Sequence, residues 1–156
     1  MAIRIIRKDG DEVLRKKSKP VEEVNEKIRL LLKDMTDTLY KHNGVGLAAP
    51  QVGILKRVVV IDAGDGLIEL VNPEIKSRDG EQVCTEGCLS LPGVWGEITR
   101  PAHIVVEALD GEGKKFVIEG EGLLAEALEH EIDHLEGVLF KDKVTRFIEK
   151  DELDKA

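Results

Sequence analysis

Apolar residues recur at helical spacing in two stretches of the chain. The first stripe follows Pro20, and its members lie three or four residues apart (Val24, Ile28, Leu31, Met35 and Leu39). It predicts a long N-terminal helix that ends near Asn43, with Gly44 in the left-handed C-terminal position. The second stripe follows Gly120–Gly122 (Leu124, Leu128, Ile132 and Leu135). It predicts a helix that runs to about Glu136 and is closed by Gly137.

Short apolar runs bounded by glycine predict strands between the two helices. The expected strands are Arg57–Asp62, Leu67–Pro73, Ile98–Asp110 and Lys115–Glu119, the last two forming a hairpin. The other segments give weaker patterns. They predict a short strand or extended arm at residues 3–7, a loop over Gly44–Gln51, an irregular segment or bent edge strand over Cys84–Gly96, and a mixed-charge tail with a short helix over Lys141–Ala156.

This order of elements predicts an α+β fold, with antiparallel or mixed strands packed around the second helix and the long helix preceding them. A chain of 156 residues with 42% hydrophobic content suits a single catalytic domain over residues 1–156. The net charge of −8 argues against nucleic acid or an anionic membrane as the main target. No apolar run approaches the roughly 18 residues of a membrane span, and the N-terminus lacks a secretory pattern, so we expect a cytoplasmic location.

The second predicted helix contains the pattern His-Glu-x-x-His (HExxH) at residues 130–134. Two histidines four residues apart lie on one helix face, where both imidazoles can reach one metal ion. Glu131 beside them is placed to accept a proton from a water molecule at that metal. The alternative is two polar side chains and an ordinary charge on the exposed face of an amphipathic helix.

A catalytic metal site needs a third protein ligand and one open position. Glu126 or Glu129 could supply it from the same helix, but a cysteine thiolate is the better ligand for a borderline-soft metal. In an extended segment Cys84 and Cys88 would lie about 13 Å apart, too far for a disulfide. A His2Cys set is therefore expected, and the residue pattern does not choose between the two cysteines.

Gln51 ends the segment of small residues that begins at Gly44. A side-chain amide can donate a hydrogen bond to an oxyanion without changing charge. The alternative is a loop residue that satisfies its own backbone.

Three segments together resemble the signature motifs of the peptide deformylase family. They are Gly-Val-Gly-Leu-Ala-Ala-Pro-Gln at 44–51, Glu-Gly-Cys-Leu-Ser at 86–90 and His-Glu-Ile-Asp-His at 130–134, in the family's order and with similar intervals. The resemblance extends from the first predicted strand to Lys143. It implies hydrolysis of the N-formyl group from the formyl-methionine of newly made polypeptides, with release of formate.

The resemblance also implies residue roles. The metal ligands would be Cys88, His130 and His134, and water on the metal would attack the formyl carbon with Glu131 as general base. Gln51 and the backbone N–H of Leu89 would meet the oxyanion, and Arg100 would support Glu86. The substrate-binding set would be Gly44, Val45, Gly46, Cys84, Glu86, Gly87, Leu123 and Ala127.

The family frequently uses one ferrous ion, and the same ligand set accepts zinc, nickel or cobalt. The implied partners are N-formylmethionyl nascent polypeptides, with a transient ribosome contact, no direct nucleic-acid site and no membrane. Two positions depart from the family pattern. Glu126 falls where some members carry an apolar pocket residue, so its charge is expected at the rim or facing out, and Trp95 falls where some carry an arginine.

Two other functions fit parts of the sequence. A metallopeptidase of the His-Glu-x-x-His type would use the same helix and Glu131, but it leaves the 44–51 segment without a purpose. A non-catalytic, metal-stabilised binding domain would have a closed fourth coordination position and leaves Glu131 unexplained.

Overall fold

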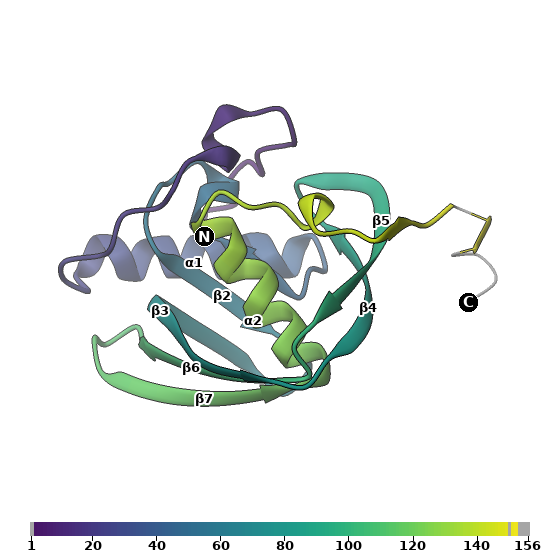
Figure 1. Cartoon of the computed structure of the whole chain (residues 1–156). Coiled ribbons are helices and arrows are strands. Elements are labelled where there is room, and N and C mark those ends of the chain that lie inside the picture. Colours follow the sequence, from purple (N-terminus) through teal and green to yellow (C-terminus); the bar gives the residue numbers. More distant parts are fainter. Residues whose placement is uncertain (1, 150, 153–156) are drawn as a thin grey trace.

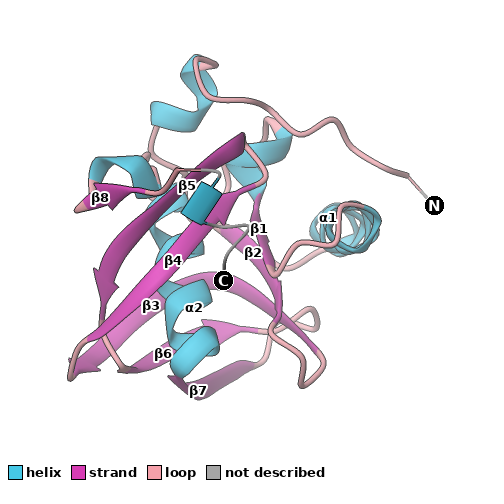
Figure 2. Cartoon of the chain, turned by 90° about the vertical axis from the view of Figure 1, so that its right-hand side faces the viewer, coloured by secondary structure: helices cyan, strands magenta, loops and turns pink. Residues whose placement is uncertain are grey.

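The computed structural model describes residues 2–149 and 151–152, which form two antiparallel sheets and two α-helices (Figures 1 and 2). The five-stranded sheet contains, in spatial order, β1 (Gly46–Ala48), β2 (Val58–Asp62), β3 (Leu67–Asp79), β6 (His103–Leu109) and β7 (Lys115–Glu121). The three-stranded sheet contains β4 (Gln82–Cys88), β5 (Leu91–Arg100) and β8 (Arg146–Phe147). The helices are α1 (Glu26–Lys41) and α2 (Gly122–Leu135), with 3-10 turns η1 (Glu12–Arg15), η2 (Ala49–Val52) and η3 (Phe140–Asp142).

The α+β class with antiparallel sheets is confirmed. Every pair of strands among the described residues is antiparallel, and the one parallel contact is an isolated bridge between Lys19 and Lys56. In Figure 1, α2 lies between the five-stranded sheet and the β4–β5 hairpin, while α1 lies behind the five-stranded sheet.

Strand β2 explains why the two helices lie on opposite faces of that sheet. Successive strand residues point to opposite faces. Val58 and Val60 accordingly pack in the cluster that contains α1, whereas Val59 and Ile61 pack in the cluster that contains α2. A strand covered on both faces needs an uninterrupted apolar run, which is the pattern from 58 to 61.

Helix α1 ends differently from the prediction. Asn25 caps its start by accepting a hydrogen bond from the Ile28 N–H. At its end the left-handed residue is Asn43, with φ of 55°, and not Gly44. Gly44 lacks a side chain for another reason: a Cβ there would meet Leu89 Cδ1 at 2.9 Å. The predicted end of α2 is confirmed, because Gly137 has φ of 76°.

Three predicted segments differ in the structure. Gly44–Gln51 is not a simple loop, since it contains β1 and part of η2. Cys84–Gly96 belongs to two paired strands instead of an irregular segment or a single bent edge strand. The predicted strand Ile98–Asp110 is divided at Pro101, which cannot donate to a ladder and separates β5 from β6. Of the two alternatives predicted for residues 3–7, a short strand or an extended arm, the structure has the extended arm, and the Arg7 N–H donates to the Gln51 carbonyl.

Strand β3 is longer than predicted, and the tail contains two elements that were not predicted. Strand β3 continues to Asp79, past the predicted end at Pro73, and pairs with β6 through a shifted register. In the tail, η3 and β8 precede the expected short helix, which falls partly on residues 150 and 153–156, outside the described part of the chain.

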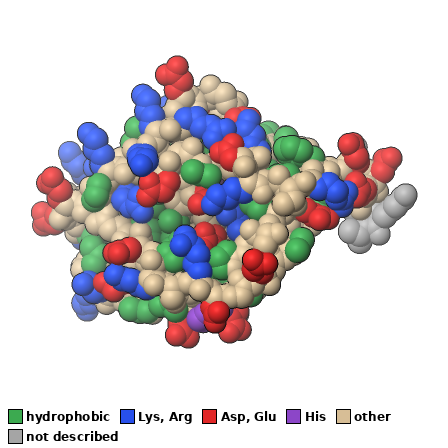
Figure 3. All heavy atoms as spheres, viewed as in Figure 1, with side chains coloured by type: hydrophobic (Ala, Val, Ile, Leu, Met, Phe, Trp, Pro, Cys, Tyr) green, Lys and Arg blue, Asp and Glu red, His purple; other side chains and the backbone are tan. Residues whose placement is uncertain are grey.

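Acidic and basic side chains are interspersed on the face shown in Figure 3. Among the described residues, no helix is both long and apolar enough to cross a membrane.

Candidate active site

A cavity of about 470 Å³ opens where the two sheets and α2 meet. Its walls include most of the site residues expected from the sequence: Gly44, Val45, Gly46, Gln51, Glu86, Gly87, Cys88, Leu89, Leu123, Ala127, His130 and Glu131. His134, Cys84 and Arg100 are buried behind these walls. The segments 44–51 and 86–90, far apart in the chain, thus face α2 across one space.

Helix α2 carries His130, Glu131 and His134, all buried. The two histidines lie one turn apart, and their ring centroids are 5.1 Å apart. Cys88, the last residue of β4, brings its Sγ within 3.4 Å of His134 Nε2. One ligand atom from each of Cys88, His130 and His134 lies within 4.8 Å of the other two. Ligands of a tetrahedral metal are separated by about 3.5 Å when the metal–ligand bonds are 2.0–2.3 Å long.

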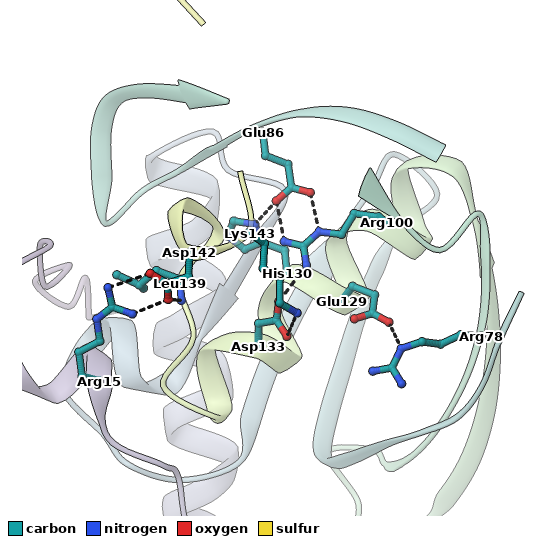
Figure 4. A network of polar contacts seen from close by, with 10 residues as sticks. All are labelled: Arg15, Arg78, Glu86, Arg100, Glu129, His130, Asp133, Leu139, Asp142 and Lys143. Carbon is teal, nitrogen blue, oxygen red and sulfur yellow. Dashed lines mark hydrogen bonds and ion pairs between the residues drawn. The ribbon is translucent and has the colours of Figure 1, made fainter. Parts of the chain in front are cut away.

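A buried ion-pair network orients His130 (Figure 4). Glu86 Oε1 lies 2.7 Å from His130 Nδ1. Arg100 donates to both oxygens of Glu86, at 2.8 and 2.9 Å, and its third contact is with Asp133 at 2.8 Å. Lys143 then pairs with Asp133 at 3.0 Å. Because Glu86 engages Nδ1, Nε2 of His130 is the ring nitrogen left on the side of the cavity, which is the arrangement of a histidine that binds metal.

The electrostatics of the three side chains favour a cation between them. Burial lowers the pKa of His134 well below its usual value, which keeps the ring neutral and able to bind metal. Burial also lowers the pKa of His130, but the charges of Glu131, Cys88 and Glu86 outweigh burial and raise this pKa well above its usual value. The anionic groups around His130 therefore attract positive charge. A divalent cation fits this donor set.

Glu131 combines burial with an unused oxygen. Its Oε1 is buried and has no hydrogen-bond partner among the described residues. Burial raises the pKa of Glu131 to about 7, close to the value that suits a general base at neutral pH. A Cβ at position 46 would meet Glu131 Oε2 at 2.7 Å. Gly46 therefore leaves room for the carboxylate of Glu131.

The side-chain amide of Gln51 is held in one orientation. Its Oε1 accepts the Ala48 N–H at 2.9 Å, which turns Nε2 toward Ser90 Oγ at 3.1 Å and Cys88 Sγ at 3.5 Å. The neighbouring turn is anchored by the N-terminal arm, because Lys8 Nζ donates to the Leu89 carbonyl and the Asp9 N–H to the Ser90 carbonyl. The Gln51 amide is thus fixed beside Cys88, and the turn at Leu89 and Ser90 is held by the N-terminal arm.

The outer part of the cavity is mostly apolar. Val45, Leu123 and Trp95 are partly exposed at its mouth. The Trp95 ring lies against Gly87, where a Cβ would meet ring carbons at 2.8–2.9 Å. Glu126 is half-buried and is part of the cavity wall, which agrees with the expected place at the rim and not with the alternative of facing out.

Three residues that contact the site were assigned no function from the sequence: Ser90, Asp133 and Lys143. Ser90 and Asp133 lie inside quoted motifs, so their position next to site residues was a usable signal. Lys143 lies ten residues beyond Asp133 and meets it only because the chain turns back after α2. Both cysteines are free thiols.

Replacing Arg100 by methionine is expected to lower the free energy of unfolding by about 3–5 kcal/mol, because buried Glu86 would lose its counter-charge. Burial tends to raise the pKa of Glu86, but Arg100 and His130 lower it to about 2. The pair therefore contributes fully above the ordinary pKa of 4.5, and its contribution is lost as pH falls through about 2. Urea unfolding of the metal-free proteins at pH 7 measures the difference.

Arg146→Met is the matched control for Arg100→Met. Arg146 also pairs with two glutamates, Glu97 and Glu152, but its side chain is 51% exposed against 2% for Arg100. An exposed pair is worth at most about 1 kcal/mol. Equal losses of stability in the two variants would contradict the importance assigned to the buried network.

Comparisons with known proteins agree on one family. A family model described as polypeptide deformylase matches residues 3–150. A peptide deformylase of Acetivibrio thermocellus is 64% identical over 99% of this chain and 91% of its own length, and one of Caldanaerobacter subterraneus subsp. tengcongensis is 63% identical over 99% and 97%. The crystal structure of the Thermotoga maritima peptide deformylase superposes with a TM-score of 0.91 at 42% identity, covering 93% of this chain and 99% of that one.

Proposed function

The chain belongs to the polypeptide deformylase family, and from this premise we propose how its own residues carry out the reaction. The reaction is the metal-dependent hydrolysis of the N-formyl group at the start of nascent polypeptides, which releases formate. The observation that carries the proposal is the convergence of the Cys88, His130 and His134 ligand atoms beside the unpartnered Glu131 oxygen and the Gln51 amide. The match to this family favours neither of the two alternatives, a metallopeptidase or a metal-stabilised binding domain.

Cys88, His130 and His134 would hold the metal, on the α2 helix that carries the His-Glu-x-x-His sequence. When bound, the ion would supply Lewis-acid activation of a water molecule and of the formyl carbonyl. The side chains of Glu86, Arg100 and Asp133 hold His130 in the tautomer with Nε2 unprotonated.

Glu131 moves the protons. Its Oε1 takes the proton of the attacking water and returns it to the amine nitrogen as the C–N bond breaks. A carboxyl with a pKa of about 7 can serve in both directions near neutral pH. Burial and the close backbone of Gly46 keep the carboxylate in place without another hydrogen-bond partner.

Gln51 and the Leu89 N–H meet the charge that develops on the formyl oxygen. One N–H of the Gln51 amide is engaged by Ser90, and the other is directed toward Cys88. Donors fixed before the reaction do not have to reorganise during it, which is the main advantage of an oxyanion site. The Ala48 N–H contact and the Lys8 contact to Leu89 supply this rigidity.

The substrate residue would lie along the outer cavity. Gly44, Val45, Gly46 and Gly87 offer backbone to an extended peptide, and Leu123 and Ala127 offer apolar surface to the methionine side chain. Cys84 adds to this surface from behind the wall.

Further features follow from the reaction. We propose residues 1–156 as one catalytic domain, since both sheets and α2 contribute to the one site. We also propose a cytoplasmic location in a bacterial-type cell and a transient contact with the ribosome, because the substrate is a nascent chain. Ferrous iron is the proposed native metal, and zinc, nickel or cobalt also suit two imidazoles and a thiolate.

The test is purification under nitrogen, elemental analysis, and an assay of formate release from formyl-Met-Ala. We expect about one metal ion per chain and formate release that stops when the metal is chelated. Cleavage of internal peptide bonds without preference for a formyl group would overturn the proposal. A preparation with zinc and no iron, equally active in air, would overturn the assignment of iron alone.

A further inference from the structure

The proposed reaction leaves one charged wall residue of the cavity unused. Glu126 lies on α2 one turn before His130, so the two side chains share a helix face. It lines the cavity together with Gly87, Leu123 and Trp95, none of which carries a charge. A carboxylate in this position faces whatever side chain enters the outer cavity.

The neighbours of Glu126 hold its carboxylate without neutralising it. Cys84 lies behind the wall, with its Sγ close to the carboxylate of Glu126. Burial and then the charge of Glu126 raise the pKa of Cys84 to about 12, so the thiol stays neutral. The Cys84 Sγ and one carboxylate oxygen each of Glu86 and Glu126 lie within 4.8 Å of one another.

Two neighbouring carboxylates, those of Glu86 and Asp133, have cationic partners. Glu86 is bound by Arg100, and Asp133 is bound by both Arg100 and Lys143. Within the described part of the chain, no lysine or arginine forms an ion pair with Glu126, and the positive charges that act on it are the more distant ones of His130 and Arg100. Burial raises its pKa, followed by the charge of Glu86. A half-buried carboxylate of this kind is stabilised by an incoming cation.

We infer that Glu126 is a specificity-determining residue that accepts the ammonium of a basic side chain at the first position of the substrate. The inference rests on the proposed function, because it takes the outer cavity as the pocket for that side chain. One helical turn, about 5.4 Å, separates Glu126 from His130 along α2, which is comparable to the reach of a four-carbon side chain. The cavity should therefore admit formyl-lysine at its mouth where a neutral wall would exclude it.

Formyl-Lys-Ala and formyl-norleucyl-Ala form the matched substrate pair, because lysine is norleucine with an ammonium on the terminal carbon. The quantity measured is the ratio of kcat/KM for the lysine substrate to that for the norleucine substrate. We expect Glu126→Gln to lower this ratio at least tenfold, mainly through a higher KM for formyl-Lys-Ala. Glu112→Gln, which removes a 75% exposed carboxylate, should leave the ratio unchanged.

A second variant tests whether the result of Glu126→Gln comes from the loss of the charge or from hydrogen bonds of the new glutamine amide. Glu126→Leu should lower the ratio at least as far as Glu126→Gln and should raise kcat/KM for the norleucine substrate. Ratios equal to that of the unmodified protein in both variants would overturn the inference, while formyl-Met-Ala would still be deformylated. Failure of the proposed function is a different result, in which none of the three formyl substrates releases formate.

Discussion

Glu131→Gln is expected to lower kcat for formate release from formyl-Met-Ala by about 10²–10⁴-fold, the usual contribution of a general acid–base group. Glutamine has the same shape and should fit beside Gly46, but it cannot accept the proton of the attacking water. The buried oxygen that now lacks a partner would become part of an amide with no basic site. Because Glu131 is not one of the three proposed ligands, the metal content should remain near one ion per chain.

The Glu131 experiment requires both formate release and elemental analysis on the same preparations. Glu136→Gln is a suitable control, because Glu136 follows the same helix and pairs with Arg57 at the surface. It should behave like the unmodified protein in both measurements. Unchanged kcat in Glu131→Gln would remove the assigned role, and loss of metal would show that Glu131 acts on the ligands instead.

Cys88→Ala should weaken metal binding by more than about 100-fold, since loss of a ligand exceeds the 10–100-fold cost of losing a residue that only supports one. Alanine removes the thiolate and cannot replace it. The remaining pair, His130 and His134, would form an incomplete site that loses its ion to a competing chelator. Competition with a chelator, followed by elemental analysis, measures the change.

Cys84→Ala is the matched control for Cys88→Ala. Both changes remove one thiol, but Cys84 is buried in the cluster with Leu91 and Ile98 and faces Glu126. Its loss should leave the metal in place. The reverse outcome, with metal lost from Cys84→Ala and kept in Cys88→Ala, would exchange the roles of the two cysteines.

The regular parts of the fold were predictable from residue patterns. The stripes of α1 and α2 are strongly periodic, and the apolar run of β2 signals a strand buried on both faces. The patterns fail where side chains carry little information. The residues of 44–51 are small, so β1 lacks the alternation of apolar and polar residues that marks a strand. Gly87 and Gly93 interrupt the same pattern in β4 and β5, so the pairing of these two strands was not predicted.

In the candidate site, too, some residues could be predicted from local sequence patterns and others could not. His130, Glu131 and His134 are close in sequence, so helical geometry alone places them together. The choice of Cys88 over Cys84 needed the resemblance to a family, because strand β4 offers both thiols at even spacing. The contact of Asp133 with Arg100 spans 33 residues, and that of Gln51 with Ser90 spans 39. Contacts of this kind depend on how the two sheets are joined, which no local pattern records.

The network from Lys143 to His130 has a consequence for the exchange of metals. The orientation of His130 is set by Glu86 and Arg100, and the position of Cys88 is set by its hairpin, so the proposed ligands are arranged by the fold. An ion that enters such a site does not have to organise the chain around it. One ion should therefore be replaced by another without unfolding, and the metal found in the cell would reflect supply and oxidation more than the identity of the ion present when the chain folded.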